Sequence, residues 1–316
     1  MTVTGADRPT RRSAHAAKPA RRTRRVHPTT RTLLILLGPF VVGFMIFTVV
    51  PFAIAVGKSF TRPNRESPFG PATDVFAGLF NYTTALSDDA FLTSFRTVLL
   101  YGLVQIPVML VGALVLALLL DSVTARFKRT FRLIYFLPYA VPGVVAAIMW
   151  LFLYAPSSSP INQVLEPLGL EPNLLSENVV LLVLANVNTW VFTGYNMLIV
   201  YSALQAIPES LYEAARLDGA SGFSIARHIK IPNVMPSILL TAVMSVIGTG
   251  QLFSEPLTLK NQITAITADY TPIMAAYRQI SAQNYGLGAA MSVIITVLIG
   301  ALSIAVFRLT RNRVSL

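Results

Sequence analysis

Six stretches of the chain, each 22 to 28 residues long, contain no Asp, Glu, Lys or Arg. They are residues 33–57, 97–120, 133–154, 178–205, 233–254 and 286–307. About 20 apolar residues in an α-helix cross the hydrocarbon core of a bilayer, and a helix satisfies its own backbone polar groups where no water is available. The sequence therefore predicts an all-α integral membrane protein with six transmembrane helices.

The composition supports this prediction. The chain is 54% hydrophobic and only 12% charged, which is far too apolar for a soluble domain of 316 residues. A net charge of +11 could indicate nucleic-acid binding, but 9 of the 25 basic residues lie in the first 31 positions and most others flank the apolar stretches. That distribution is typical of membrane topology, so we expect the chain to meet a lipid bilayer and no nucleic acid.

The basic residues also predict the orientation. Nineteen lie in the N-terminal tail, in residues 121–132 and 205–232, and at the C-terminus, whereas the alternate segments carry six. Because Lys and Arg concentrate in cytoplasmic loops, we expect both termini to be cytoplasmic. Residues 1–31 have no apolar face and are predicted to be a basic, disordered cytoplasmic tail, which leaves residues 32–316 as the membrane domain.

The polar loop at residues 208–232 has strong local signals for two short helices. Pro208 suits the first turn of a helix, where its missing N–H costs nothing. Gly219 can adopt the left-handed conformation that ends a helix. Ser221 can cap a second helix, which we expect Pro232 to end. The charge distribution places this loop in the cytoplasm, as a surface on which another protein can dock.

The same loop carries a family resemblance. Glu213-Ala214-Ala215 is followed by Gly219 after three residues and by Ile229-Lys230-Ile231-Pro232 after nine more. This pattern resembles the EAA loop of ABC importer permeases, with Ile-Pro in place of the usual Leu-Pro. Residues 137–145 are similar to the third-span region of sugar permeases, and residues 78–82 and 161–162 are similar to their outer loops.

The resemblance implies a type I ABC importer transmembrane domain over residues 32–316. It implies import of a sugar delivered by an extracellular solute-binding protein, with glycerol phosphate or another polyol as the alternative substrate. The implied partners are a second permease in a heterodimer and two copies of a cytoplasmic ABC ATPase, in a bacterial or archaeal cytoplasmic membrane. ATP and Mg would bind to the ATPase, and this chain would hold no cofactor and would not be an enzyme.

The resemblance also implies a role for the loop, whose first helix would sit in a groove on the ATPase. Glu213 would make a polar contact there, the two alanines would allow close packing, and Gly219 would form the turn. The implied coupling residues are Glu213, Ala214, Ala215, Asp218, Gly219, Ile229 and Pro232.

Polar side chains inside the predicted spans are the candidates for a substrate path, because each is costly against lipid. In the fourth stretch they recur at spacings of 3, 4 and 3 residues, which places them on one face of a helix, and the fifth stretch has a similar stripe. Amides, hydroxyls and an indole ring suit a sugar, although they also suit helix–helix hydrogen bonds. The candidates are Asn186, Thr189, Trp190, Thr193, Asn196, Thr241, Ser245, Gln251 and Glu255.

No catalytic or metal site is predicted. Gly57-Lys58-Ser59 resembles the end of a phosphate-binding loop, but Phe52 occupies the position of the required glycine. There is no cysteine, and the three histidines are scattered. A self-contained, ATP-independent carrier is the alternative class, but such carriers commonly use charged groups inside their spans, which these six stretches lack.

Overall fold

The structure is a computed structural model, and it describes residues 30–64, 73–122, 127–155, 159–169, 173–177 and 179–314. The predicted disordered tail therefore lies almost entirely outside the described residues. The chain divides into two compact units, residues 1–51 and residues 52–316.

The described part of the first unit is helical. Helix α1 (Thr30–Phe44) continues into the π-helical turn η1 (Met45–Val49), and α2 (Val50–Ser59) follows directly. In the turn, the N–H of Val50 donates to the carbonyl of Met45, five residues earlier. Pro51 follows directly, and since its ring cannot donate a hydrogen bond, the wider turn lets the helix continue past it.

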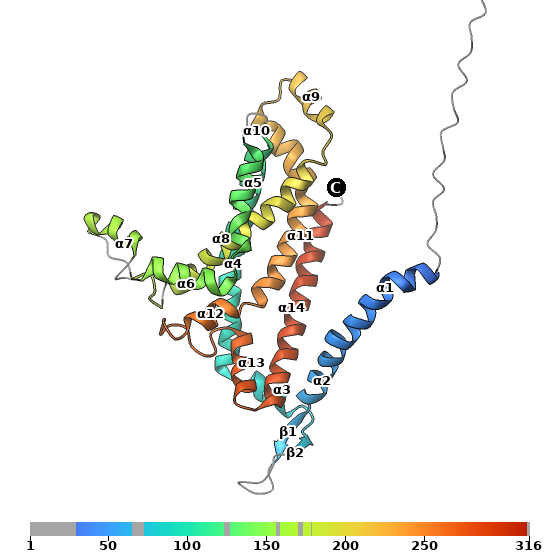
Figure 1. Cartoon of the computed structure of the whole chain (residues 1–316), viewed down its shortest axis with the longest axis vertical. Helices are drawn as coiled ribbons and strands as arrows, with labels where there is room; N and C mark the ends of the chain where they lie inside the picture. The colour runs from blue at the N-terminus through green and yellow to red at the C-terminus, as the bar shows by residue number, and fades with distance from the viewer. Residues whose placement is uncertain are drawn as a thin grey trace, which may run out of the picture. The chain divides into compact units, whose positions relative to one another are not determined.

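Four long helices form the framework of the second unit (Figure 1). They are α4 (Asp89–Asp121), α8 (Val180–Leu204), α11 (Ile231–Gly250) and α14 (Tyr285–Val314). Helices α4, α8 and α11 pack against one another, and α14 packs on α11. The short helices α9 (Glu209–Leu217) and α10 (Gly222–Ile225) lie at one end, whereas α3 (Phe80–Leu86), α12 (Ser254–Leu259) and α13 (Pro272–Ser281) lie toward the other.

Four helical segments among the described residues are long and apolar enough to cross a membrane: Ile35–Ser59, Asp89–Asp121, Gly222–Leu259 and Tyr285–Arg308. A bent pair of helices, Lys128–Ala140 and Gly143–Tyr154, makes a fifth if it counts as one span. The stretch predicted at 178–205 forms the continuous 25-residue α8 but is not among these candidates. Three asparagines lower its hydropathy, and the count of six spans stays a prediction.

The third predicted stretch is not a single straight helix. Helix α5 (Lys128–Phe136) and the 3-10 turn η2 (Leu137–Ala140) meet α6 (Gly143–Tyr154) at an angle of 96°. Val141 between them is extended, with φ −82° and ψ 123°, because a residue before proline avoids the helical region. Pro142 thus separates the two helices, and α6 leads to α7 (Pro160–Leu165) and the 3-10 turn η3 (Glu166–Leu168).

A small hairpin and two polar contacts organise the end opposite α9. Strands β1 (Thr61–Asn64) and β2 (Thr73–Phe76) pair antiparallel. The buried amide of Asn81 on α3 donates to the carbonyls of Ser59 and Thr61, at 2.8 and 2.7 Å. Arg278 of α13 lies 2.7 Å from a carboxylate oxygen of Asp269, and burial raises the pKa of that carboxyl while the arginine opposes the shift.

Candidate functional site

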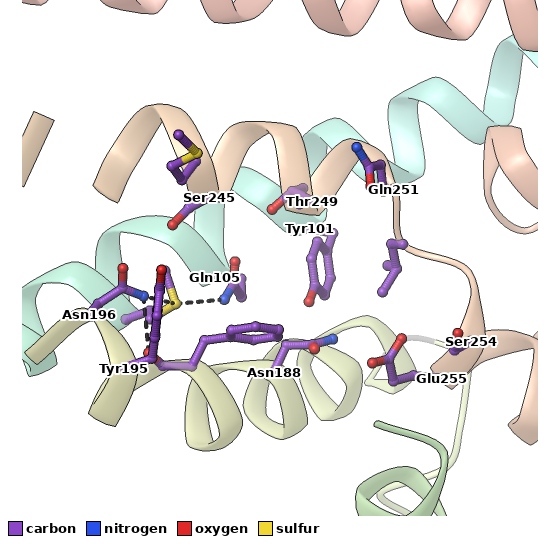
Figure 2. Close-up of a pocket in the computed structure, with 15 residues that line it drawn as sticks. Tyr101, Gln105, Asn188, Tyr195, Asn196, Ser245, Thr249, Gln251, Ser254 and Glu255 are labelled. Atoms are coloured by element: carbon purple, nitrogen blue, oxygen red, sulfur yellow. Dashed lines mark hydrogen bonds between the residues drawn. The ribbon is translucent and has the colours of Figure 1, made fainter. Parts of the chain in front are cut away.

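A cavity of about 340 Å³ lies between α4, α8, α11 and the start of α12. That volume is in the range of small-molecule sites, which run from about 300 to 1,000 Å³. Figure 2 shows polar side chains from these helices converging on it. The polar residues of its lining are Tyr101, Gln105, Asn188, Tyr195, Asn196, Ser245, Thr249, Gln251, Ser254 and Glu255.

Four of the nine predicted path residues line this cavity: Asn196, Ser245, Gln251 and Glu255. Five do not, and for the four of these that lie on α8 the reason is a rotation of about one residue on that helix. The cavity-facing residues of that helix are Asn188, Phe192, Tyr195 and Asn196. Spacings of 4, 3 and 1 residues also place these side chains on one face of a helix. This face combines amides with aromatic rings, so a purely polar pattern does not reveal it.

Four of the remaining five predicted side chains have partners elsewhere. Asn186 donates to the hydroxyl of Tyr154 at 2.7 Å, and Trp190 packs edge-on against Trp150. The other three are Thr189, Thr193 and Thr241; the hydroxyl of Thr193 donates to the carbonyl of Thr189 at 2.5 Å, and that of Thr241 to the carbonyl of Ile238 at 2.9 Å. The contacts of Asn186 and Trp190 with α6 fit the helix–helix role that the sequence left open, whereas the two threonine hydroxyls bond within their own helices.

The amides in the cavity are incompletely bonded. Asn188 is 5% exposed, and its side-chain nitrogen faces the Tyr101 hydroxyl without a well-formed hydrogen bond to it or to another described residue. The amide nitrogens of Gln105 and Asn196 donate to the sulfur of Met109, at 3.2 and 3.4 Å, and thioether sulfur is a weak acceptor. The Asn196 amide also donates to the carbonyl of Phe192, at 3.0 Å. The donors of Asn188 and Gln105 are therefore available to a ligand that offers oxygen acceptors.

Aromatic rings line the cavity beside these amides. Phe192 and Tyr195 line the cavity. Tyr139 of η2 stacks on Tyr195 with ring centroids 4.7 Å apart, and it meets Phe192 edge-on at 5.8 Å. The bend between α5 and α6 thus brings Tyr139 against the rings that border the cavity, which fixes their orientation.

Glu255 is the one charged residue among the described residues that line the cavity. Its carboxylate lies against Gly143, at the first residue of α6, where an added Cβ would overlap it. The N-terminus of a helix carries partial positive charge, which favours a carboxylate there. No Lys, Arg or His belongs to the described lining, so the electrostatic character of the cavity is weakly acidic.

The polar loop forms the short helices that the sequence predicts. Helix α9 begins directly after Pro208, and Gly219 has φ +81°, the left-handed conformation that ends a helix. The hydroxyl of Ser221 accepts from the N–H of Ser224 and caps α10. Leu217 is 89% exposed. The seven predicted coupling residues divide by exposure: Glu213, Ala214, Asp218, Gly219 and Pro232 are exposed, whereas Ala215 and Ile229 are half-buried.

The prediction that Pro232 ends the second helix was wrong. A π-helical turn, η4 (Ala226–Lys230), follows α10, and α11 continues from it. The N–H of Ile231 donates to the carbonyl of Ala226, five residues earlier, just before the proline that has no N–H. The wider turn absorbs the proline as it does before Pro51, so α10 and α11 form one continuous helical segment.

Comparison with known proteins identifies the family. Residues 113–316 match the family described as binding-protein-dependent transport system inner membrane component. The chain is 31% identical over 295 residues to the sn-glycerol-3-phosphate transport system permease protein UgpA of Agrobacterium fabrum, with 92% of this chain and 98% of that relative covered. It is 29% identical over 283 residues to the arabinooligosaccharides transport system permease protein AraP of Halalkalibacterium halodurans, with 87% of this chain and 86% of that relative covered.

A solved structure shows the same fold. The crystal structure of a bacterial ABC transporter involved in the import of the acidic polysaccharide alginate matches with a TM-score of 0.76 at 20% identity, over 89% of this chain and 96% of that chain. These findings confirm the predicted ABC importer transmembrane fold. The chain therefore belongs to the inner membrane components of binding-protein-dependent transport systems, and it is a permease subunit of an ABC importer and not an enzyme.

Proposed function

We propose that this permease imports a neutral carbohydrate through the cavity between α4, α8, α11 and α12. The lining carries the proposal: amide and hydroxyl groups suit the hydroxyls of a sugar, and the rings of Phe192 and Tyr195 suit its flat C–H faces. The amide nitrogen of Asn188, which faces the Tyr101 hydroxyl without a well-formed hydrogen bond, gives such a ligand a buried donor.

The charge of the lining argues against an anionic substrate. Two like unit charges about 4 Å apart repel by about 4 kcal/mol at an effective dielectric constant of about 20. A phosphate ester in this cavity would meet the carboxylate of Glu255 without a compensating Lys or Arg from the described lining. A sugar without ionised groups avoids that cost.

Glycerol phosphate is the second candidate, because a relative of 31% identity is named as an sn-glycerol-3-phosphate permease. Other relatives favour sugars: one is named for arabinooligosaccharides, and the lactose transport system permease protein LacF of Rhizobium radiobacter is 29% identical over 258 residues. The relatives therefore include both substrate classes, and the charge of the lining favours the first.

We further propose the assembly in which this permease works. It pairs with a second permease in a heterodimer and binds two copies of a cytoplasmic ABC ATPase, which holds ATP and Mg, and it receives substrate from an extracellular binding protein. Both termini and the 208–232 loop face the cytoplasm of a bacterial or archaeal cell. Supporting this, α9 is exposed and presents Glu213, Ala214 and Leu217 on its surface.

Uptake by the complete complex tests the substrate class. The complex is purified with its binding protein, reconstituted in liposomes, and given labelled neutral mono- and oligosaccharides or labelled glycerol 3-phosphate, with and without ATP. We expect ATP-dependent uptake of a neutral sugar. Uptake of glycerol 3-phosphate and of no neutral sugar would overturn the substrate class, while uptake of any solute without ATP would contradict the importer assembly itself.

A further inference from the structure

A part-buried ion pair joins the end of α4 to the start of α11. The ammonium of Lys230 in η4 lies 2.6 Å from a carboxylate oxygen of Asp121, the last residue of α4. The side chains are 14% and 7% exposed. The other carboxylate oxygen accepts from the amide nitrogen of Gln205, directly after α8, at 2.6 Å.

The coupling helix α9 takes part in the same cluster. The ammonium of Lys230 lies 5.1 Å from the centre of the Tyr212 ring, in the middle of α9, at cation–π distance. The Tyr212 hydroxyl is buried without a hydrogen-bond partner among the described residues. Burial raises the pKa of this phenol and the nearby charge of Asp121 raises it further, so the ring stays neutral.

The cluster is thus a meeting point of four elements. Asp121 brings a carboxylate to the C-terminal end of α4, where the helix dipole is already negative, so the carboxylate needs a cation. Lys230 supplies this cation. The π-helical turn that accommodates Pro232 sets the position of Lys230 on the α10–α11 segment. Its ammonium then has one face for the carboxylate and another for the ring of Tyr212.

We propose that the cluster of Asp121, Lys230, Gln205 and Tyr212 is the joint that transmits movement of α9 to the helices of the substrate cavity. The proposal rests on the proposed function in one respect, the contact of α9 with an ATPase. Asp121, Lys230 and Tyr212 act as positioning residues: none of them lines the cavity.

The packing between the joint and the cavity supports this role. The cavity meets α4 at residues 101–109 and α8 at residues 188–196. The next turns of both helices toward the joint form one buried core, made of Ala113, Ala117, Leu120, Met197, Val200, Tyr201 and Leu204, with Val234 of α11. Close-packed cores pass displacements on instead of absorbing them, so a shift at the joint reaches the cavity through continuous contacts.

A charge exchange tests the proposal. Asp121→Asn, Lys230→Met and the double exchange Asp121→Lys with Lys230→Asp are compared in the complete importer in liposomes. The readout is solute imported per ATP hydrolysed, measured alongside ATPase recovery on the tagged permease. We expect each single variant to bind ATPase and lower this ratio by about fivefold or more, the usual scale of allosteric coupling.

The double exchange is expected to restore at least half of the lost ratio. Lys58→Met is the matched control, since Lys58 also pairs with an aspartate, Asp74, but at a site about half exposed and far along the chain from the joint. Single variants that bind ATPase and keep the wild-type ratio would overturn the joint. A wild-type permease that recovers no ATPase would instead overturn the proposed function.

Tyr212 gives a second test that does not remove a charge. Tyr212→Phe keeps the ring over Lys230 and loses only a hydroxyl that has no hydrogen-bond partner among the described residues, so we expect the wild-type ratio. Tyr212→Leu loses the cation–π contact, and we expect the ratio to fall while the abundance of the complex stays normal. Equal ratios in these two variants would show that the ring is not part of the joint.

Discussion

Gly194 of α8 lies so close to the backbone of α5 that a Cβ at this position would overlap the carbonyl oxygen of Tyr135. This approach fixes the bent α5–α6 pair on the helix that borders the cavity. We expect Gly194→Ala to lower the free energy of unfolding by about 1 to 3 kcal/mol, the usual cost of overpacking. Thermal unfolding of the purified protein in detergent measures the change.

Gly300→Ala is the matched control, because a Cβ at Gly300 of α14 meets no atom within 4 Å. There we expect no loss and a gain of up to about 1 kcal/mol from the higher helix propensity of alanine. Equal losses in the two variants would contradict the close approach at Gly194.

Two substitutions of Gly219 distinguish the effect of backbone conformation from the effect of charge at the end of α9. Asparagine tolerates the left-handed conformation better than other residues with a Cβ, so we expect Gly219→Asn to keep most transport. Gly219→Asp has similar size but adds a negative charge beside Asp218, and we expect it to lower ATPase recovery and transport while membrane insertion stays normal. Wild-type transport by Gly219→Asp at normal abundance would remove this turn from the proposed coupling role.

Asn188 and Asn186 lie two residues apart on α8 and offer a direct comparison. Asn188 lines the cavity and has no well-formed hydrogen bond from its amide nitrogen among the described residues, whereas Asn186 donates to Tyr154 outside the cavity. Losing a hydrogen bond to a ligand costs about 0.5 to 1.5 kcal/mol, so we expect Asn188→Leu to weaken sugar import by about two- to tenfold. Asn186→Leu should leave uptake kinetics unchanged, and the reverse order of effects would place the substrate on the other face of α8.

Asn81 has a structural role in the segment that resembles a sugar-permease outer loop. Its amide donates to two backbone carbonyls, so Asn81→Asp would set a carboxylate oxygen against two acceptors. We expect a loss of about 1 to 3 kcal/mol of unfolding free energy, the cost of buried groups left unpaired. Asn233→Asp makes the same change at an exposed amide and should cost less in the same unfolding measurement; an equal cost would contradict the role of burial.

The sequence predicted the fold class and the local structure of the coupling loop because both depend on local signals. The absence of charge over more than 20 residues requires helices in a membrane, and the turn after α9 requires only that Gly219 adopt positive φ. In the sequence, the bend between α5 and α6 is indicated only by Pro138 and Pro142. The direction of the bend depends on the packing of Tyr139 and of the Tyr135 backbone against α8.

The cavity was harder to predict, because the inward face of α8 is set by its neighbours and not by its own pattern. The polar stripe that begins at Asn186 was chosen for its regular spacing, yet the cavity faces the stripe that begins at Asn188. The two π-helical turns also escaped prediction. Each comes two residues before a proline, Pro51 or Pro232, a position that usually suggests the end of a helix.

Recovery of partners from native membranes tests the central claim most directly. The tagged chain is purified in a mild detergent, and its associated proteins are identified by mass spectrometry, for the wild type and for a Glu213→Lys, Gly219→Asp variant. The account predicts an ATPase with a Gly-x-x-x-x-Gly-Lys-Ser/Thr loop and a second permease with the wild type, and loss of the ATPase alone with the variant. A chain that purifies without an ATPase, and that moves solute in liposomes without ATP, would contradict it.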